Sequence, residues 1–162
     1  SFNQSVSNFN TAKVTNMYDM FLGCSSFNQS VSNFNTAKVT NMYDMFLGCS
    51  SFNQSVSNFN TAKVTDMSYM FGNCTAFNQS LATFSLASAS NLTNMLNGCD
   101  INAAGTTTNY DATLVAWAAA DVPNSLNFHG GTSKYSTAGG GTAARASLID
   151  DDLWTITDGG EL

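Results

Sequence analysis

Charged residues are scarce in this chain. They make up 10% of its 162 residues, and Lys and Arg together number 5. Because no basic stripe is available to meet phosphates, we expect no binding to nucleic acid. No apolar run approaches the roughly 20 residues of a membrane-spanning helix, so we expect no membrane insertion. With a single histidine and no nucleophile-elbow motif, the chain offers little material for a catalytic centre. We therefore expect neither an enzyme nor a cofactor.

What the chain does have is an internal repeat. Residues 1–25 recur without change at 26–50 and return at 51–75 with changes only in the second half. A looser copy follows at 76–100. A fixed period of this length is typical of stacked units and not of a globule around one buried centre. Function is therefore to be sought on an extended surface.

Each unit combines two spacings of apolar residues. Over 39–49 the apolar residues are 3, 3, 1 and 3 apart, which favours one face of a short helix. Phe27 and Val31 lie an even number of residues apart with polar neighbours between them, which suits a short strand with one buried side. The sequence predicts an α/β solenoid. Every 25-residue turn would add one strand to a parallel sheet and one short helix to the opposite face.

The period ends after Cys99. We divide the chain into a four-repeat solenoid, residues 1–100, and a capping segment of the same domain, residues 101–162. Such a segment would cover the last apolar face of the array. Its predicted elements are a connecting loop (102–109), a helix (110–120) with Pro123 just beyond it, a strand (125–128), a helix (142–149) and a strand (154–157).

One run of residues resembles a known family. The segment Met20 to Gln29 has the form Met-Phe-x-x-Cys-x-x-Phe-Asn-Gln, and Val-Thr-Asn/Asp-Met stands at 39–42 and 64–67. These motifs resemble the BspA-like leucine-rich repeats of bacterial surface proteins, most closely a 25-residue subtype found in lipoproteins and adhesin-like wall proteins. The resemblance covers residues 1–100. It implies a leucine-rich-repeat-like solenoid and an extracellular or cell-surface location, without implying an activity. The family often has Trp at one column where this chain has Phe (Phe9, Phe34, Phe59).

The cysteines recur once per unit. Stacking would place neighbours about 4.8 Å apart, within the Cα separation of a disulfide, whereas a linear column does not suit tetrahedral zinc. We favour a ladder of buried free thiols, with at least one disulfide as the alternative. The column consists of Cys24, Cys49, Cys74 and Cys99.

Other polar groups carry weaker signals. His129 has no partner motif, so we interpret it as structural. Asp150, Asp151 and Asp152 could bind calcium together with Asp158, but they lack the spacing of a dedicated loop, and a solvated turn is favoured. Two further columns, Lys13/Lys38/Lys63 and Asp19/Asp44, are interpreted as solvated edges.

The polar columns beside the first phenylalanine of each unit are the candidate recognition surface. Their Asn, Gln and Ser residues repeat without exception. Stacked amides can hydrogen-bond along the axis, and this structural interpretation is favoured for Asn and Gln. The alternative is a neutral face suited to a protein or glycan ligand. The candidate contact residues are Asn28, Ser30, Ser32, Asn53, Ser55 and Ser57.

The leading hypothesis is a non-enzymatic, adhesin-like module that recognises a protein or glycan. The runner-up is a purely structural spacer of a long surface or fibrous protein, which the identical copies favour slightly. Because Ser1 opens directly on a repeat, we also expect a piece of a longer protein. The uncapped first unit further suggests end-to-end self-association.

Overall fold

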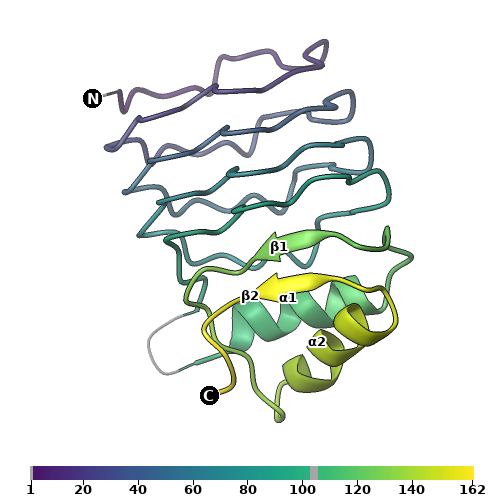
Figure 1. The fold of residues 1–162 in the computed structure, drawn as a ribbon. Coiled ribbons are helices and arrows are strands. Elements are labelled where there is room, and N and C mark those ends of the chain that lie inside the picture. Colours follow the sequence, from purple (N-terminus) through teal and green to yellow (C-terminus); the bar gives the residue numbers. More distant parts are fainter. Residues whose placement is uncertain (1, 103–105) are drawn as a thin grey trace.

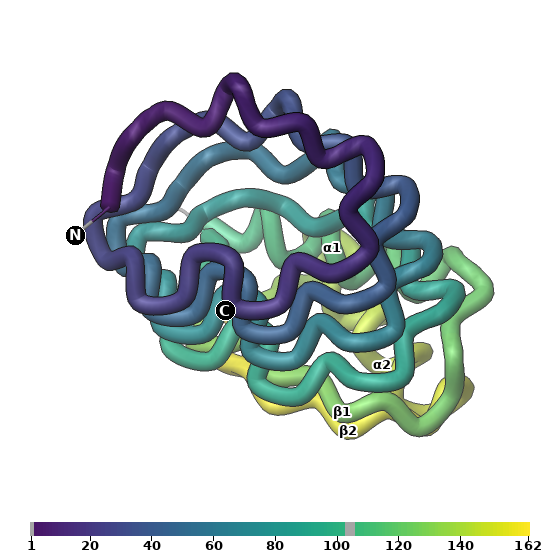
Figure 2. The backbone as a smooth tube through the Cα atoms, turned by 90° about the horizontal axis from the view of Figure 1, so that it is seen from above, coloured from purple at the N-terminus to yellow at the C-terminus, as the bar shows by residue number. Residues whose placement is uncertain are grey.

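The computed structural model describes residues 2–102 and 106–162. The four 25-residue units lie one above another as coils and lead to the helices of the C-terminal segment (Figure 1). Viewed along the stack, successive coils follow the same outline (Figure 2). Ser1 and positions 103–105 of the predicted connecting loop lie outside the described residues. Parallel bridges join equivalent positions of neighbouring units, namely Asn16 to Asn41, Asn41 to Asp66, and Asp66 to Asn91.

The short helix predicted in each unit is wrong. Residues 2–102 contain turns and isolated bridges and no helix. Within the expected helix, Asp44 has a φ of 54°, which no right-handed helix accommodates. Phe46 donates its N–H to Met70 O of the next unit at 2.9 Å and not to a carbonyl four residues back. The 3, 3, 1, 3 spacing belongs instead to successive tight turns, one of which is closed by Cys49 N–H on Phe46 O at 2.9 Å.

The predicted strand over 27–31 is likewise not formed. Its side chains do alternate, because Phe27 and Val31 are buried while Asn28 and Ser30 are exposed. The link to the preceding unit, however, uses a side chain: Asn28 N–H donates to Asn3 Oδ1 at 3.0 Å. An amide oxygen therefore takes the place that a strand carbonyl would occupy, and the parallel bridges form elsewhere in the unit.

Stacked phenylalanine rings form the core. In one column, consecutive ring centroids lie 5.9 Å apart, and in a second column they lie 5.3 and 5.6 Å apart. The two columns pack against each other at 4.2 to 4.3 Å. Aromatic pairs of this kind add about 0.5–1.5 kcal/mol each beyond their buried area. The columns are Phe27/Phe52/Phe77 and Phe21/Phe46/Phe71, and all six side chains are buried.

The C-terminal segment forms two helices and two strands, as the sequence predicts. They are α1 (Thr108–Ala118), β1 (Asn127–His129), α2 (Gly141–Asp150) and β2 (Thr155–Thr157). β1 and β2 pair in parallel, and α1 lies beside α2 (Figure 1). None of the helices in the described part of the chain has the length and apolar character needed to cross a bilayer.

The segment continues the stack directly. A bridge joins Leu92 of the fourth unit to Phe128 of β1, and Leu96 N–H donates to His129 O at 3.0 Å. From α1, Trp117 packs edge-on to Phe128 with ring centroids 5.1 Å apart. The apolar face of the fourth unit is therefore covered by β1 and α1.

Candidate functional site

The candidate contact residues lie along one exposed strip, here called the polar strip. In the second unit, Asn28, Ser30 and Ser32 are exposed, whereas Phe27 and Val31 between and beside them are buried. The third unit repeats the arrangement with Asn53, Ser55 and Ser57. A tight turn, in which Phe34 N–H donates to Val31 O at 3.0 Å, ends the strip in the second unit. All six candidates are therefore brought to one surface.

The asparagines of the strip form a ladder. Asn28 Oδ1 accepts the N–H of Asn53 and the Nε2 amide of Gln54, each at 3.0 Å. Asn53 Oδ1 accepts the equivalent groups one unit further on, at 2.8 and 2.9 Å. The ladder ends on α1, where Asn109 Nδ2 donates to Asn78 Oδ1 at 2.9 Å. The amide oxygens thus hold the units together.

The serines of the strip are ordered within their own unit. Ser30 Oγ donates to Ser32 Oγ at 3.0 Å and accepts the Ser32 N–H at 3.3 Å. Ser55 and Ser57 form the same pair. Because both members are exposed, these hydroxyls stay accessible while their backbone is fixed. The strip therefore offers neutral hydrogen-bonding groups in a repeated arrangement.

The cysteine column is one of free thiols. Cys49 Sγ donates to Phe21 O at 3.0 Å, and Cys74 Sγ and Cys99 Sγ make the same bond to the unit before them. Burial raises the pKa of the Cys49 and Cys99 thiols to about 12. Protonated, buried thiols are poor nucleophiles and poor metal ligands, so the three buried cysteines serve in packing, whereas Cys24 is half-buried.

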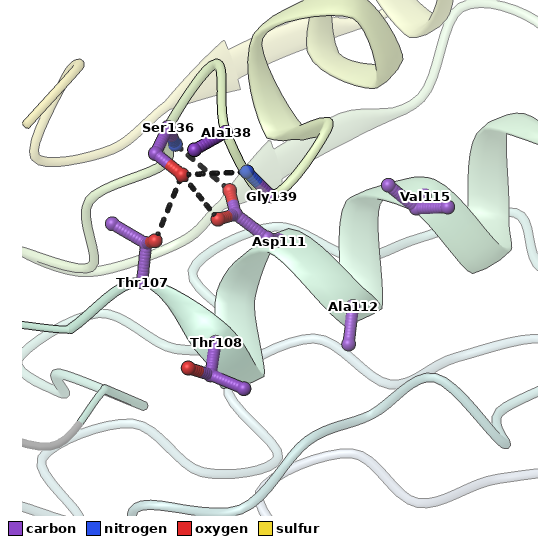
Figure 3. Close-up of a pocket in the computed structure, with 8 residues that line it drawn as sticks. All are labelled: Thr107, Thr108, Asp111, Ala112, Val115, Ser136, Ala138 and Gly139. Atoms are coloured by element: carbon purple, nitrogen blue, oxygen red, sulfur yellow. Dashed lines mark hydrogen bonds between the residues drawn. The ribbon is translucent and has the colours of Figure 1, made fainter.

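A hollow of about 530 Å³ lies beside α1 in the C-terminal segment (Figure 3). Its polar centre is Asp111, whose two carboxylate oxygens accept Ser136 N–H at 2.8 Å and Ser136 Oγ–H at 2.7 Å. Ser136 Oγ in turn accepts from Thr107 Oγ1 and from Gly139 N–H, each at 3.0 Å. These groups satisfy one another and fasten the chain around 136–139 to α1. These hydrogen bonds therefore have a structural role.

Two other candidate groups, His129 and Asp158, have structural partners. His129 Nδ1 accepts the Gly131 N–H at 3.0 Å. Asp158 Oδ2 accepts from Arg145 Nε at 2.8 Å and from Tyr110 OH at 2.9 Å, so its carboxylate is occupied within the C-terminal segment. Within residues 2–102 and 106–162, no three His, Cys, Asp or Glu side chains gather closely enough to hold a metal ion.

The interpretation of Asp19 and Asp44 as solvated edges is wrong for Asp44. This residue is 8% exposed, and its Oδ1 is buried without a hydrogen-bond partner, as is Asp19 Oδ1. Burial, and to a lesser extent the nearby Asp19 charge, raises the pKa of Asp44. The backbone adopts a left-handed conformation here, with a φ of 54°. The recurring Asp before Met in the first two units, a residue that tolerates this conformation, was the signal for it.

Comparison with known proteins identifies the family. The model of the family described as Mycoplasma protein of unknown function, DUF285, matches residues 1–110, and the chain belongs to that family. No curated protein and no solved structure matches the chain.

Proposed function

We propose that this member of the DUF285 family is a non-enzymatic repeat module of the bacterial cell surface, folded as a leucine-rich-repeat-like solenoid. Its polar strip would bind a protein or a glycan. The observation that supports this most directly is the repeated, exposed Ser30–Ser32 and Ser55–Ser57 hydroxyl pairs. Because hydrogen bonds order them before a ligand arrives, binding costs little conformational entropy.

The chemistry of the strip fits an uncharged, hydrogen-bonding ligand. Hydroxyl groups donate and accept equally well, which matches sugar hydroxyls and peptide groups. The strip contains no charged residue. Binding should therefore depend only weakly on salt, unlike recognition based on ion pairs.

A glycan array followed by titration of purified glycans tests the glycan arm, and a titration against purified surface-protein candidates tests the protein arm. Replacing Ser32 and Ser57 by Ala removes two exposed hydroxyls, and we expect at least a tenfold loss of affinity. The matched control, Ala37→Ser with Ala62→Ser, changes exposed turn positions and should bind normally. Absence of saturable binding in both arms, or equal binding by both variants, contradicts the proposal.

The spacer hypothesis has an observation of its own. The Oδ1 atoms of Asn28 and Asn53 are occupied by the next unit, and residues 1–25 and 26–50 are identical. Both features favour a spacer, whose role is to set length and stiffness, over a recognition module. Under this alternative, deleting residues 26–50 shortens the stack and changes no binding, because there is no specific ligand. In a recognition module, the same deletion removes part of the binding surface and lowers the affinity for the ligand.

A further inference from the structure

Three lysines lie one above another on the outside of the stack. Lys13, Lys38 and Lys63 occupy the same position in the first three units, and all three are exposed. Successive coils follow the same outline (Figure 2), and neighbouring units joined by parallel bridges lie about 5 Å apart. The three side chains therefore form one positive row along the axis of the stack, here called the lysine row.

No acidic partner neutralises the lysine row. Within the described part of the chain, the one ion pair joins Arg145 to Asp158 in the C-terminal segment. The acidic residues of the first three units are withdrawn from solvent, since Asp44 is buried and Asp19 and Asp66 are half-buried. The charge exposed along the row is therefore positive, although the whole chain has a net charge of −6.

The turn that carries each lysine forms without it. The turn around Lys38 is closed by Val39 N–H on Thr36 O at 2.9 Å. The equivalent bond in the fourth unit, which has Ser88 at the lysine position, measures 2.8 Å. Like charges on neighbouring units also repel one another. Lysine is therefore not needed for the fold, and the repulsion is relieved when negative charge lies along the row.

An amide donor precedes each lysine by three residues. Asn35 Oδ1 accepts the Ala37 N–H at 3.1 Å, and Asn60 Oδ1 accepts the Ala62 N–H at 3.1 Å. Both asparagines are exposed, and their Nδ2 groups donate to no other group among the described residues. Asn10 forms the same turn in the first unit. Each of the three units therefore offers a charged and a neutral donor within four residues.

We propose that the lysine row binds a linear acidic polysaccharide laid along the stack. Carboxylates on successive sugars would pair with the ammonium groups, and sugar hydroxyls would accept from the asparagine amides. The rings of Phe34 and Phe59, four residues before two of the lysines, are buried. They present no platform for the stacking on which binding of single-stranded nucleic acid relies, which favours a polysaccharide as the ligand.

This is a second surface, with a ligand class of its own. Along the coil, the turn at 31–34 separates the lysine row from the polar strip. The strip is uncharged, whereas the row acts through exposed ammonium groups, so binding to the row should weaken strongly as salt rises. Salt dependence therefore distinguishes the two surfaces.

The probe is oligogalacturonate, which has one carboxylate per sugar, and its fully methyl-esterified form is the neutral control. In a calorimetric titration of the purified chain at low salt, we expect saturable binding of the acid form and none of the ester. The affinity should fall at least tenfold between about 20 and about 200 mM salt.

Variants locate the binding. Lys38→Gln should weaken it about fivefold, and Lys38→Gln with Lys63→Gln at least tenfold, whereas Lys38→Arg should preserve it. Lys134→Gln is the matched control, because Lys134 is exposed in the C-terminal segment and its loss changes the net charge equally. Ser32→Ala with Ser57→Ala should leave this binding unchanged.

Four outcomes would overturn the proposal. They are a lack of saturable binding at low salt, equal binding of the esterified probe, an equal loss with Lys134→Gln, and tighter binding of a single-stranded oligonucleotide with the same number of charges.

Discussion

Replacing one phenylalanine at different heights in the stack measures how much the units depend on their neighbours. Phe2 and Phe52 stand in the same local sequence, Ser-Phe-Asn-Gln-Ser. Phe52 is 0% exposed, and its ring lies 5.9 Å from that of Phe27 and 5.9 Å from that of Phe77. Phe2 is 39% exposed and stacks on Phe27 alone within its column, at 5.8 Å. Local sequence is therefore constant while the environment changes.

We expect Phe52→Ala to lower the free energy of unfolding by about 3–5 kcal/mol, the usual cost of removing a buried phenylalanine. Phe2→Ala should cost only about 1–2 kcal/mol, because part of the ring already meets water and no cavity closes around the site. Guanidinium unfolding followed by circular dichroism gives both values from the midpoint and slope.

Phe27→Ala serves as the control. Phe27 is 0% exposed and has column neighbours on both sides, so its loss should match that of Phe52→Ala. If all three substitutions cost the same, each unit would be stabilised by its own contacts. Equal costs would therefore refute the argument that stacking stabilises the units.

Four other tests address thiols and charged groups. At pH 8 one thiol, Cys24, should react rapidly with Ellman's reagent and all four should react in guanidinium. Because folding raises the pKa of the Cys49 thiol to about 12, the unfolded state loses its proton first, and stability should fall from about pH 9 to 12. Asp44→Asn should raise stability at neutral pH, because it removes a buried carboxylate charge, the same burial that raises the pKa of Asp44. This gain should vanish as the pH falls below the ordinary Asp pKa of 3.8, because the Asp44 carboxyl is then protonated in both the folded and the unfolded state; no gain at pH 7 would contradict it. Arg145→Ala leaves the buried Asp158 carboxylate without its ion partner and should cost about 3–5 kcal/mol. Adding Asp158→Asn should recover part of that loss, and failure to recover any would point to lost packing.

The sequence was sufficient to predict the periodic core and the C-terminal elements. Apolar columns such as Phe27/Phe52/Phe77 are buried as expected. With a strict 25-residue period, stacking the units places each residue directly against its equivalents in the neighbouring units. The alanine-rich run around Trp117 forms α1, where local propensity and periodicity agree. Both kinds of evidence are local or strictly repeated, and such evidence can be read from one sequence.

The backbone path inside the units could not be read in the same way. A spacing of 3, 3, 1 and 3 fits one helix face and equally fits a run of three-residue turns. The choice is made by non-local hydrogen bonds, in which Phe46 N–H bonds to Met70 O, and by the left-handed conformation of Asp44. The sequence does contain a hint, because one position is Gly in the first, second and fourth units and Asn in the third, and all four residues have positive φ. Asn94 in the fourth unit, with a φ of 54°, repeats the conformation of Asp44.

The recognition and spacer hypotheses can be distinguished because the asparagines and the serines of the polar strip have different hydrogen-bond partners. The asparagine oxygens join one unit to the next, so substituting Asn28 changes stability whether or not a ligand exists. The exposed Ser32 and Ser57 hydroxyls are bonded only within their own units. In the fourth unit, Ser80 is instead partly buried against Thr113 of α1, so the open strip stops there. A ligand that spans several units gains affinity by multivalency, and deleting 26–50 should then weaken binding by far more than one lost contact would. A spacer would show only a shorter stack.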